Sequence, residues 1–186
     1  MKINKWIYRL VIVVFSGLLL GGMSCSSKSY GKKVKEPFTG SKYQSNNKWF
    51  RATGKGSSIK DNIARSKADL DAKTLLGGQL NTTIKKVADQ YLGQTENADA
   101  ADVADKFQVL AREVMNTDMA DLRKIGEEKF YDGEKYTVFI AYEIKKNAMF
   151  RYLKKQAKTS AILNDKERKS IEEMIDKELE KLDADE

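Results

Sequence analysis

The chain has 186 residues with a single cysteine, no histidine and a formal net charge of +7. Without histidine it lacks the usual general base and the usual zinc ligand, and one cysteine can form neither an internal disulfide nor a thiolate metal site. This composition disfavours most enzyme and metal-binding classes, so we expect no catalytic residues, no metal ligands and no cofactor.

The first 25 residues follow the order that is typical of a secretory signal. Basic residues precede an apolar run over residues 10–20, and small residues then lead to Cys25. As a helix this run would be only about 16 Å long, roughly half of a bilayer's hydrocarbon core. We therefore expect residues 1–24 to be removed as a signal peptide and not to span a membrane.

The residues around Cys25 resemble a bacterial lipoprotein signal, in which a diacylglyceryl group is attached to a cysteine and the chain is cut just before it. Ser24 is suitably small, while Gly22 stands where Leu or Val is more usual. The alternative is an ordinary signal peptide with an incidental cysteine. The sequence predicts lipidation of Cys25 and a mature chain that its acyl chains hold on a membrane.

Residues 25–47 are predicted to form a lipidated cysteine followed by a flexible basic tether. Residues 28–55 contain eight Lys or Arg residues and one acid, whereas residues 164–186 contain ten acids and five bases. Beside a lipid anchor, a basic stretch fits an anionic headgroup layer, and a solvated linker is the equal alternative. We expect the membrane as a partner, and no nucleic acid, because an exported protein does not meet it.

An α+β domain is predicted over residues 48–158. An aromatic strand at 49–53 is expected to end in a turn at Gly54-Lys55-Gly56, with a helix start at Ser57 or Ser58. The apolar residues up to position 91 recur at helical spacing, and alanines at 64, 68 and 72 predict tight packing on a sheet. Gly77-Gly78 within this helix predicts a kink or the close approach of another backbone.

The second half of the domain contains the clearest strand pattern. A helix after Asp99 leads to a predicted hairpin, with strands at 125–131 and 136–144 joined at Asp132-Gly133. The second of these strands is apolar on both faces and is expected to be the inner one. A helix over 147–158 follows. The expected fold is a small three-stranded antiparallel sheet packed by a long helix, with a C-terminal helical extension.

The acidic residues form no pattern that is typical of catalysis or calcium binding. Asp99, Asp102 and Asp105 have the spacing of a solvent-facing helix surface, and no EF-hand loop is present. Glu127 and Glu128 are adjacent on a predicted strand, so their side chains point to opposite faces. Side chains that point apart cannot act together in glycoside hydrolysis.

Residues 159–186 are predicted to form an acidic amphipathic helix. Its apolar stripe has the width of a contact between two helices. The helix either packs back on its own domain or contacts a second copy or another envelope protein. In the second case the candidate partner contacts are Ile171, Ile175, Leu179 and Leu182.

Residues 48–144 together resemble a known family. The resemblance lies in an aromatic strand ending in Gly-Lys-Gly, a long helix with the three alanines, and a hairpin with Asp132-Gly133 before an alternating strand. This order is similar to the twenty-kilodalton outer-membrane lipoprotein family, whose relatives include a flagellar lipoprotein that builds disks beneath the outer membrane. The resemblance implies a small α+β domain without known catalytic residues, attached at the outer membrane.

These observations predict a lipid-anchored structural or interaction subunit of the cell envelope. Residues 26–29 lack the acidic cluster of surface-export signals, so we expect the domain to face the periplasm. The alternative is a lipoprotein that binds a small ligand or the cell wall. A cleft lined by Trp49, Tyr136 and Tyr142 would favour this alternative, whereas an exposed apolar face repeated between copies would favour assembly.

Overall fold

The computed structural model describes residues 31, 34–117 and 121–184. The chain forms two units, Met1–Val34 and Lys35–Glu186. The predicted signal peptide, Cys25 and most of the basic segment before Lys35 lie outside the described residues. Within the described part of the chain, all helices and strands belong to the second unit, and none of these helices is long and apolar enough to cross a membrane.

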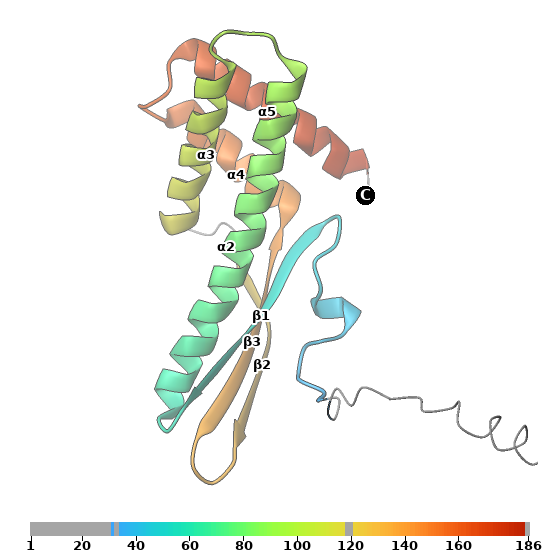
Figure 1. The fold of residues 1–186 in the computed structure, drawn as a ribbon, viewed down its shortest axis with the longest axis vertical. Coiled ribbons are helices and arrows are strands. Elements are labelled where there is room, and N and C mark those ends of the chain that lie inside the picture. The colour runs from blue at the N-terminus through green and yellow to red at the C-terminus, as the bar shows by residue number, and fades with distance from the viewer. Residues whose placement is uncertain (1–30, 32–33, 118–120, 185–186) are drawn as a thin grey trace, which may run out of the picture. The chain divides into compact units, whose positions relative to one another are not determined.

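The second unit is an α+β domain, which confirms the predicted fold class (Figure 1). Its elements in chain order are η1 (Ser41–Tyr43), β1 (Trp49–Ser58), α2 (Asp61–Gln94), α3 (Ala100–Thr117), β2 (Arg123–Tyr131), β3 (Tyr136–Lys145), α4 (Lys146–Thr159) and α5 (Asp165–Ala184). The antiparallel sheet has the order β1-β3-β2, so β3 is the inner strand as predicted. Gly133, with a φ of 95°, allows the tight turn between β2 and β3.

The first half of α2 packs on one face of the sheet at unusually close range. Ala64, Ala68 and Ala72 are fully buried there. A Cβ atom on Gly54 would lie 2.2 Å from the carbonyl oxygen of Ala68, and one on Gly56 would lie 2.2 Å from that of Ala64. Small residues on both elements therefore allow the two backbones to approach each other.

This contact corrects the predicted turn at Gly54-Lys55-Gly56. The three residues lie inside β1, which continues to Ser58, and α2 begins at Asp61. The glycines are required by the helix that crosses the strand and not by a change of chain direction. Gly77-Gly78 was predicted to mark a kink or the close approach of another backbone. No close approach is found at Gly78, because a Cβ there would have no atom within 4 Å among the described residues.

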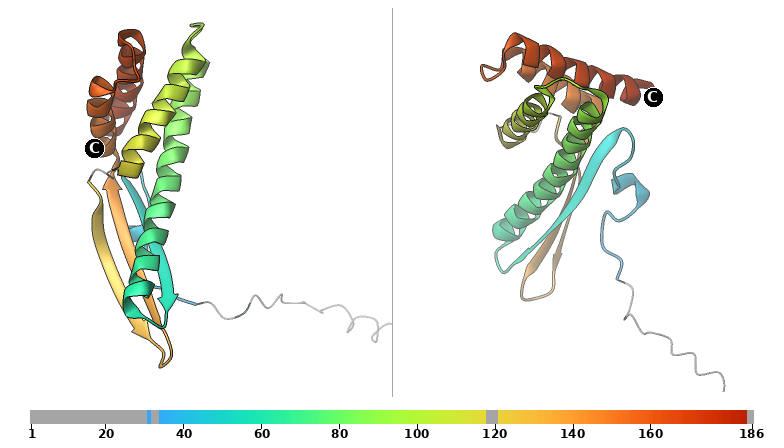
Figure 2. Two further views of the ribbon diagram at one scale, coloured as in Figure 1. Left: turned by 90° about the vertical axis from the view of Figure 1, so that its left-hand side faces the viewer. Right: turned by 45° about the horizontal axis from the view of Figure 1, so that its top comes forward.

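The second half of α2 joins α3, α4 and α5 in a helical layer beyond the sheet (Figure 2). The largest side chains of this core are fully buried and come from all four helices; they include Leu80, Phe107, Phe150, Leu153, Ile171 and Ile175. Phe50 and Ile144 extend the same cluster onto the sheet. A second, smaller cluster of Ala64, Ala68, Val138 and Ile140 fills the space between the first half of α2 and the sheet.

Residues 35–47, here named the strap, pack on the sheet face opposite α2. The Ser45 hydroxyl accepts the N–H of Arg51 at 2.8 Å, and Lys55 forms an ion pair with Glu36 at 2.6 Å. A Cβ on Gly126 would lie only 2.5 Å from the nearest atom of the Phe38 ring, so the ring fits there because residue 126 has no side chain. The tether was predicted to extend over residues 25–47, but residues 35–47 are held on the sheet and are not a flexible tether.

Candidate functional site

The stripe on α5 faces the core of its own chain. Ile171 and Ile175 have no exposed surface, and Leu179 and Leu182 are partly buried against the same cluster. The structure thus corrects the candidate partner contact, because in this fold its two central side chains are not available to another chain. It favours the other alternative, a helix packed on its own domain.

Polar contacts at the start of α5 explain this placement. Asn164 and Glu167 form a capping box, in which each side chain accepts the backbone N–H of the other residue at 3.0 Å. Lys106 of α3 donates a hydrogen bond to Glu167 at 2.8 Å. This ammonium, together with the Asn164 N–H, lowers the pKa of Glu167 below its ordinary value. The helix start is therefore fixed to α3 as well as capped.

The three aromatic residues proposed to line a cleft do not face one another. Trp49 lies on the strap side of the sheet, where the guanidinium groups of Arg51 and Arg123 stand 5.5 and 5.2 Å from its ring centre. Tyr136 and Tyr142 lie on the opposite face, towards α2. These three residues therefore do not line a common cleft, and they give no support to a ligand site.

Tyr142 takes part in a hydrogen-bonded group between the sheet and α2. Its hydroxyl donates to Asp69 at 2.6 Å, and Lys73 donates to the other oxygen of Asp69 at 2.8 Å. Burial, followed by the bond to Asp69, raises the pKa of Tyr142 to about 12. Burial opposes ionisation of Asp69, but the bonds from Lys73 and Tyr142 lower its pKa overall.

We expect this group to give one late-titrating tyrosine. Because folding raises the pKa of Tyr142 from 10.0 to about 12, the neutral phenol stabilises the fold below pH 10, and this contribution is lost as the pH rises to about 12. The measurement is the ultraviolet absorbance of tyrosinate during alkaline titration. Tyr142→Phe should remove the late component and Tyr131→Phe should retain it; a late component that survives Tyr142→Phe would refute the assignment.

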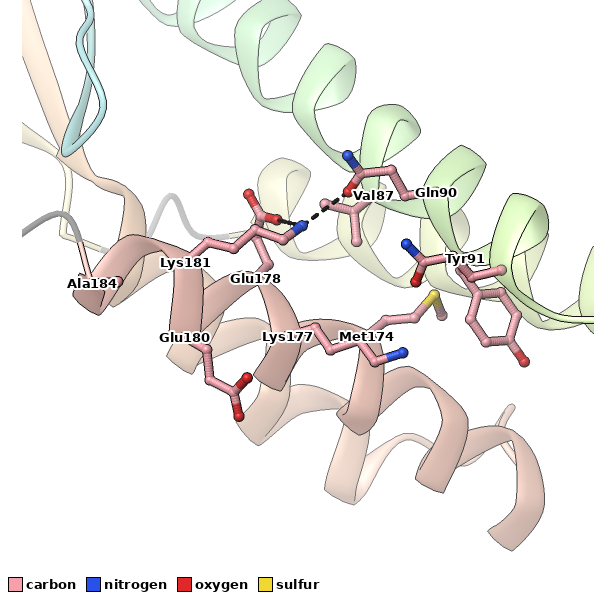
Figure 3. Close-up of a pocket in the computed structure, with 10 residues that line it drawn as sticks. Val87, Gln90, Tyr91, Met174, Lys177, Glu178, Glu180, Lys181 and Ala184 are labelled. Carbon is pink, nitrogen blue, oxygen red and sulfur yellow. Dashed lines mark hydrogen bonds and ion pairs between the residues drawn. The ribbon is translucent and has the colours of Figure 1, made fainter.

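A groove of 440 Å³ lies between the ends of α2 and α5 (Figure 3). Val87, Tyr91 and Met174 give it an apolar floor. On its rim the Lys181 ammonium donates to Gln90 at 3.0 Å and to Glu178 at 2.9 Å. The groove is suited to an amphipathic molecule, whose apolar part would rest on the floor.

A second surface lies at the end of the sheet, where β1 leads into α2 and β2 turns into β3. Here Ile59, Ile63, Phe130 and Tyr131, named the sheet tip, are exposed. This surface was not predicted from the sequence, although two signals were present. Ile59 and Ile63 are out of phase with the alanine stripe, and Phe130-Tyr131 directly precede the Asp132-Gly133 turn.

The acidic residues behave as their spacing predicts. Glu127 and Glu128 point to opposite faces of the sheet, and Glu127 forms ion pairs with Arg65 and Lys124. Asp99 pairs with Lys166 of α5. Within the described ranges, no group of three acidic, cysteine or histidine side chains could hold a metal ion.

The chain matches no family model, no curated protein and no solved structure. The resemblance to the twenty-kilodalton outer-membrane lipoprotein family therefore rests only on the residues that carry it in the sequence. Membership of that family is a hypothesis.

Proposed function

We propose that the chain is a lipid-anchored envelope protein that acts as a structural or interaction subunit at the outer membrane, on its periplasmic side. One observation carries the proposal: the only cysteine follows an apolar run and a small-residue exit, ten residues before the folded domain begins at Lys35. A cysteine at that place can be acylated and become the first residue of the mature chain.

The surface of the domain supports the interaction part of the proposal. Ile59, Ile63 and Tyr131 of the sheet tip expose 72%, 41% and 58% of their surface, and none of them belongs to the buried clusters of the domain. Large apolar side chains that gather on a surface are typical of sites that contact another molecule. The family resemblance supports the outer membrane as the location, with a second copy or another envelope protein as the partner.

The proposal predicts that Cys25→Ser abolishes membrane attachment. We expect the variant to accumulate as an uncut precursor or as a soluble exported form, because no other thiol can receive the lipid. Labelling of cells with radioactive palmitate and detergent partitioning measure the effect. Ser27→Ala, two residues beyond the cysteine, is the matched control and should remain labelled. An unchanged membrane fraction and unchanged labelling of Cys25→Ser would contradict the proposal.

Binding of a small ligand is the second candidate, and the α2–α5 groove favours it. Its apolar floor and charged rim could hold an amphipathic molecule. If so, an amphipathic fluorescent probe should bind the domain, and Tyr91→Ala should weaken its binding severalfold. Tyr131→Ala should leave binding unchanged, because Tyr131 ends β2 at the sheet tip, away from the groove. Equal binding to both variants would exclude the groove as the site.

A further inference from the structure

The sheet tip brings exposed apolar side chains from two segments of the chain to one end of the domain. The exposed fractions are 72% for Ile59, 41% for Ile63, 48% for Phe130 and 58% for Tyr131. The first segment contains Ile59, between β1 and α2, and Ile63, in the first turn of α2; the second contains Phe130 and Tyr131, which end β2. The pairing of Ser58 and Tyr131 with the same residue of β3, Tyr136, brings these two segments to one end of the sheet.

The aromatic side chains of the tip are held in fixed positions. The Phe130 ring packs edge-on against Phe139 at 5.9 Å, and the Tyr131 ring lies 4.7 Å from that of Tyr136. The Tyr131 hydroxyl donates to the carbonyl oxygen of Gly133 at 2.8 Å. Phe130 and Tyr131 are adjacent in β2, so the tip presents one fixed aromatic side chain on each face of the sheet end. Contact of this end with another surface would cost little side-chain entropy.

The strap runs along the sheet towards the tip as it approaches Lys35. Going from Arg51 to Lys55 along β1, the strap partners run from Ser45 back to Glu36. The chain therefore approaches Lys35 while moving towards Ser58, the last residue of β1. From Lys55, the end of the sheet is only about 10 Å away.

The length of the chain between Cys25 and Lys35 favours the same end. Its ten residue steps span at most about 35 Å in any conformation. Asp71 of α2 accepts the N–H of Lys55 at 2.9 Å, and from there α2 continues to Gln94, about 35 Å further. The tip lies well within the reach of a lipidated Cys25, whereas the far end would require the whole connection to be stretched along the domain.

The two ends of the domain differ in aromatic side chains and not in charge. The tip segments, residues 58–63 and 129–136, carry equal numbers of basic and acidic residues, and Lys129 pairs with Asp61. At the far end, Asp99 pairs with Lys166 and Asp102 with Lys106, so the acids of residues 94–105 are largely balanced. A neutral end that carries an exposed tyrosine and phenylalanine fits the interfacial layer of a membrane.

We propose that the sheet tip rests on the lipid surface that holds the acyl chains of Cys25, with the helical end directed away from the membrane. This inference rests on the proposed lipid anchor. It adds a second point of contact, which fixes the orientation of the domain. The groove between α2 and α5 then faces away from the bilayer, where a periplasmic partner can reach it.

The test uses the full lipidated chain in vesicles of phosphatidylethanolamine and phosphatidylglycerol that contain doxyl-labelled lipid. Since Cys25 is acylated, Tyr131→Cys gives a single reactive thiol for an environment-sensitive fluorophore. Ile162→Cys is the matched control, because Ile162 is 47% exposed in the turn before α5, at the helical end. We expect severalfold stronger quenching of the label at position 131 than at position 162. Adding Ile59→Asp to the Tyr131→Cys chain should reduce the quenching to the control level.

Each outcome decides the inference. Equal quenching at both positions, on protein that floats with the vesicles and carries the acyl mass, overturns the tip contact and leaves the anchor intact. A label at position 131 that is shielded from aqueous iodide but not quenched by doxyl lipid means that a second copy of the chain covers the tip, which also overturns the inference. Protein that neither floats nor carries acyl chains overturns the anchor and the tip contact together.

Discussion

Gly54→Ala is expected to destabilise the domain by about 3 kcal/mol or more, although it adds only one methyl group. The added Cβ would lie 2.2 Å from the Ala68 carbonyl oxygen and 2.3 Å from the Ala72 nitrogen, and both are backbone atoms of α2. A side chain could turn away, but these atoms move only if the helix lifts from the sheet. Urea unfolding of the chain from Lys35 onward measures the change.

Gly78→Ala is the matched control for this prediction. Gly78 is exposed in the middle of α2, and in the described part of the chain an added Cβ would meet no atom within 4 Å. The same substitution should there raise the free energy of unfolding by roughly 0.5–1 kcal/mol, because alanine favours a helix over glycine. A decrease in the free energy of unfolding for Gly54→Ala and an increase for Gly78→Ala would support the close contact between α2 and β1. A Gly54→Ala domain as stable as the unmodified one would contradict it.

Ile175→Asp is the second substitution with a large expected effect, and it should unfold the helical layer. The side chain is fully buried among α2, α3 and α4. Loss of an isoleucine from a core costs about 2–5 kcal/mol, and an unpaired buried carboxylate adds to this cost. The sum approaches the whole stability of a typical domain.

Circular dichroism and sedimentation test this second prediction together. Ile162→Asp, the same substitution at an exposed position, should leave the melting curve nearly unchanged. If Ile175→Asp melted normally but lost self-association, α5 would be a contact between chains. That result would contradict the packing of α5 on its own domain.

The sequence predicted those elements whose pattern is repeated locally. The alanine stripe of α2 identified both the helix and its packing partner, because three small residues at helical spacing permit a close contact with a flat surface. The alternation in β3 identified the strand, and apolar residues on both of its faces identified its inner position. The hairpin turn could be placed because Asp132-Gly133 has local turn chemistry.

The role of Gly54 and Gly56 could not be predicted in the same way. A glycine pair around a lysine is equally compatible with a turn and with a strand crossed by a helix. The choice depends on Ala64 and Ala68, whose backbone the strand meets only in the folded domain. Local propensity was therefore overridden by a tertiary contact.

The strap was missed for a related reason. Phe38 packs on Gly126, far away in the sequence, and its φ of 56° is uncommon for an aromatic residue. No periodic pattern of apolar residues in the sequence predicts a contact of this kind. The segment has a polar composition and contains the only proline, both of which are typical of a linker.

The candidate site was predicted least well. The apolar stripe on α5 correctly marked a buried face, but a stripe does not specify whether the same chain or another covers it. The ion pair between Lys106 and Glu167, which joins α3 to α5, depends on the three-dimensional arrangement of the helices. The sheet tip arises from residues that are separated along the chain and meet only when β1, α2 and the hairpin come together.

Intact-mass and peptide mass spectrometry of the membrane-extracted protein can detect the proposed lipid anchor itself. We expect a mature chain that begins at Cys25, with an N-terminal peptide that carries the mass of a diacylglyceryl group. An N-terminal peptide with an unmodified cysteine, or a mature chain that begins elsewhere, would contradict it.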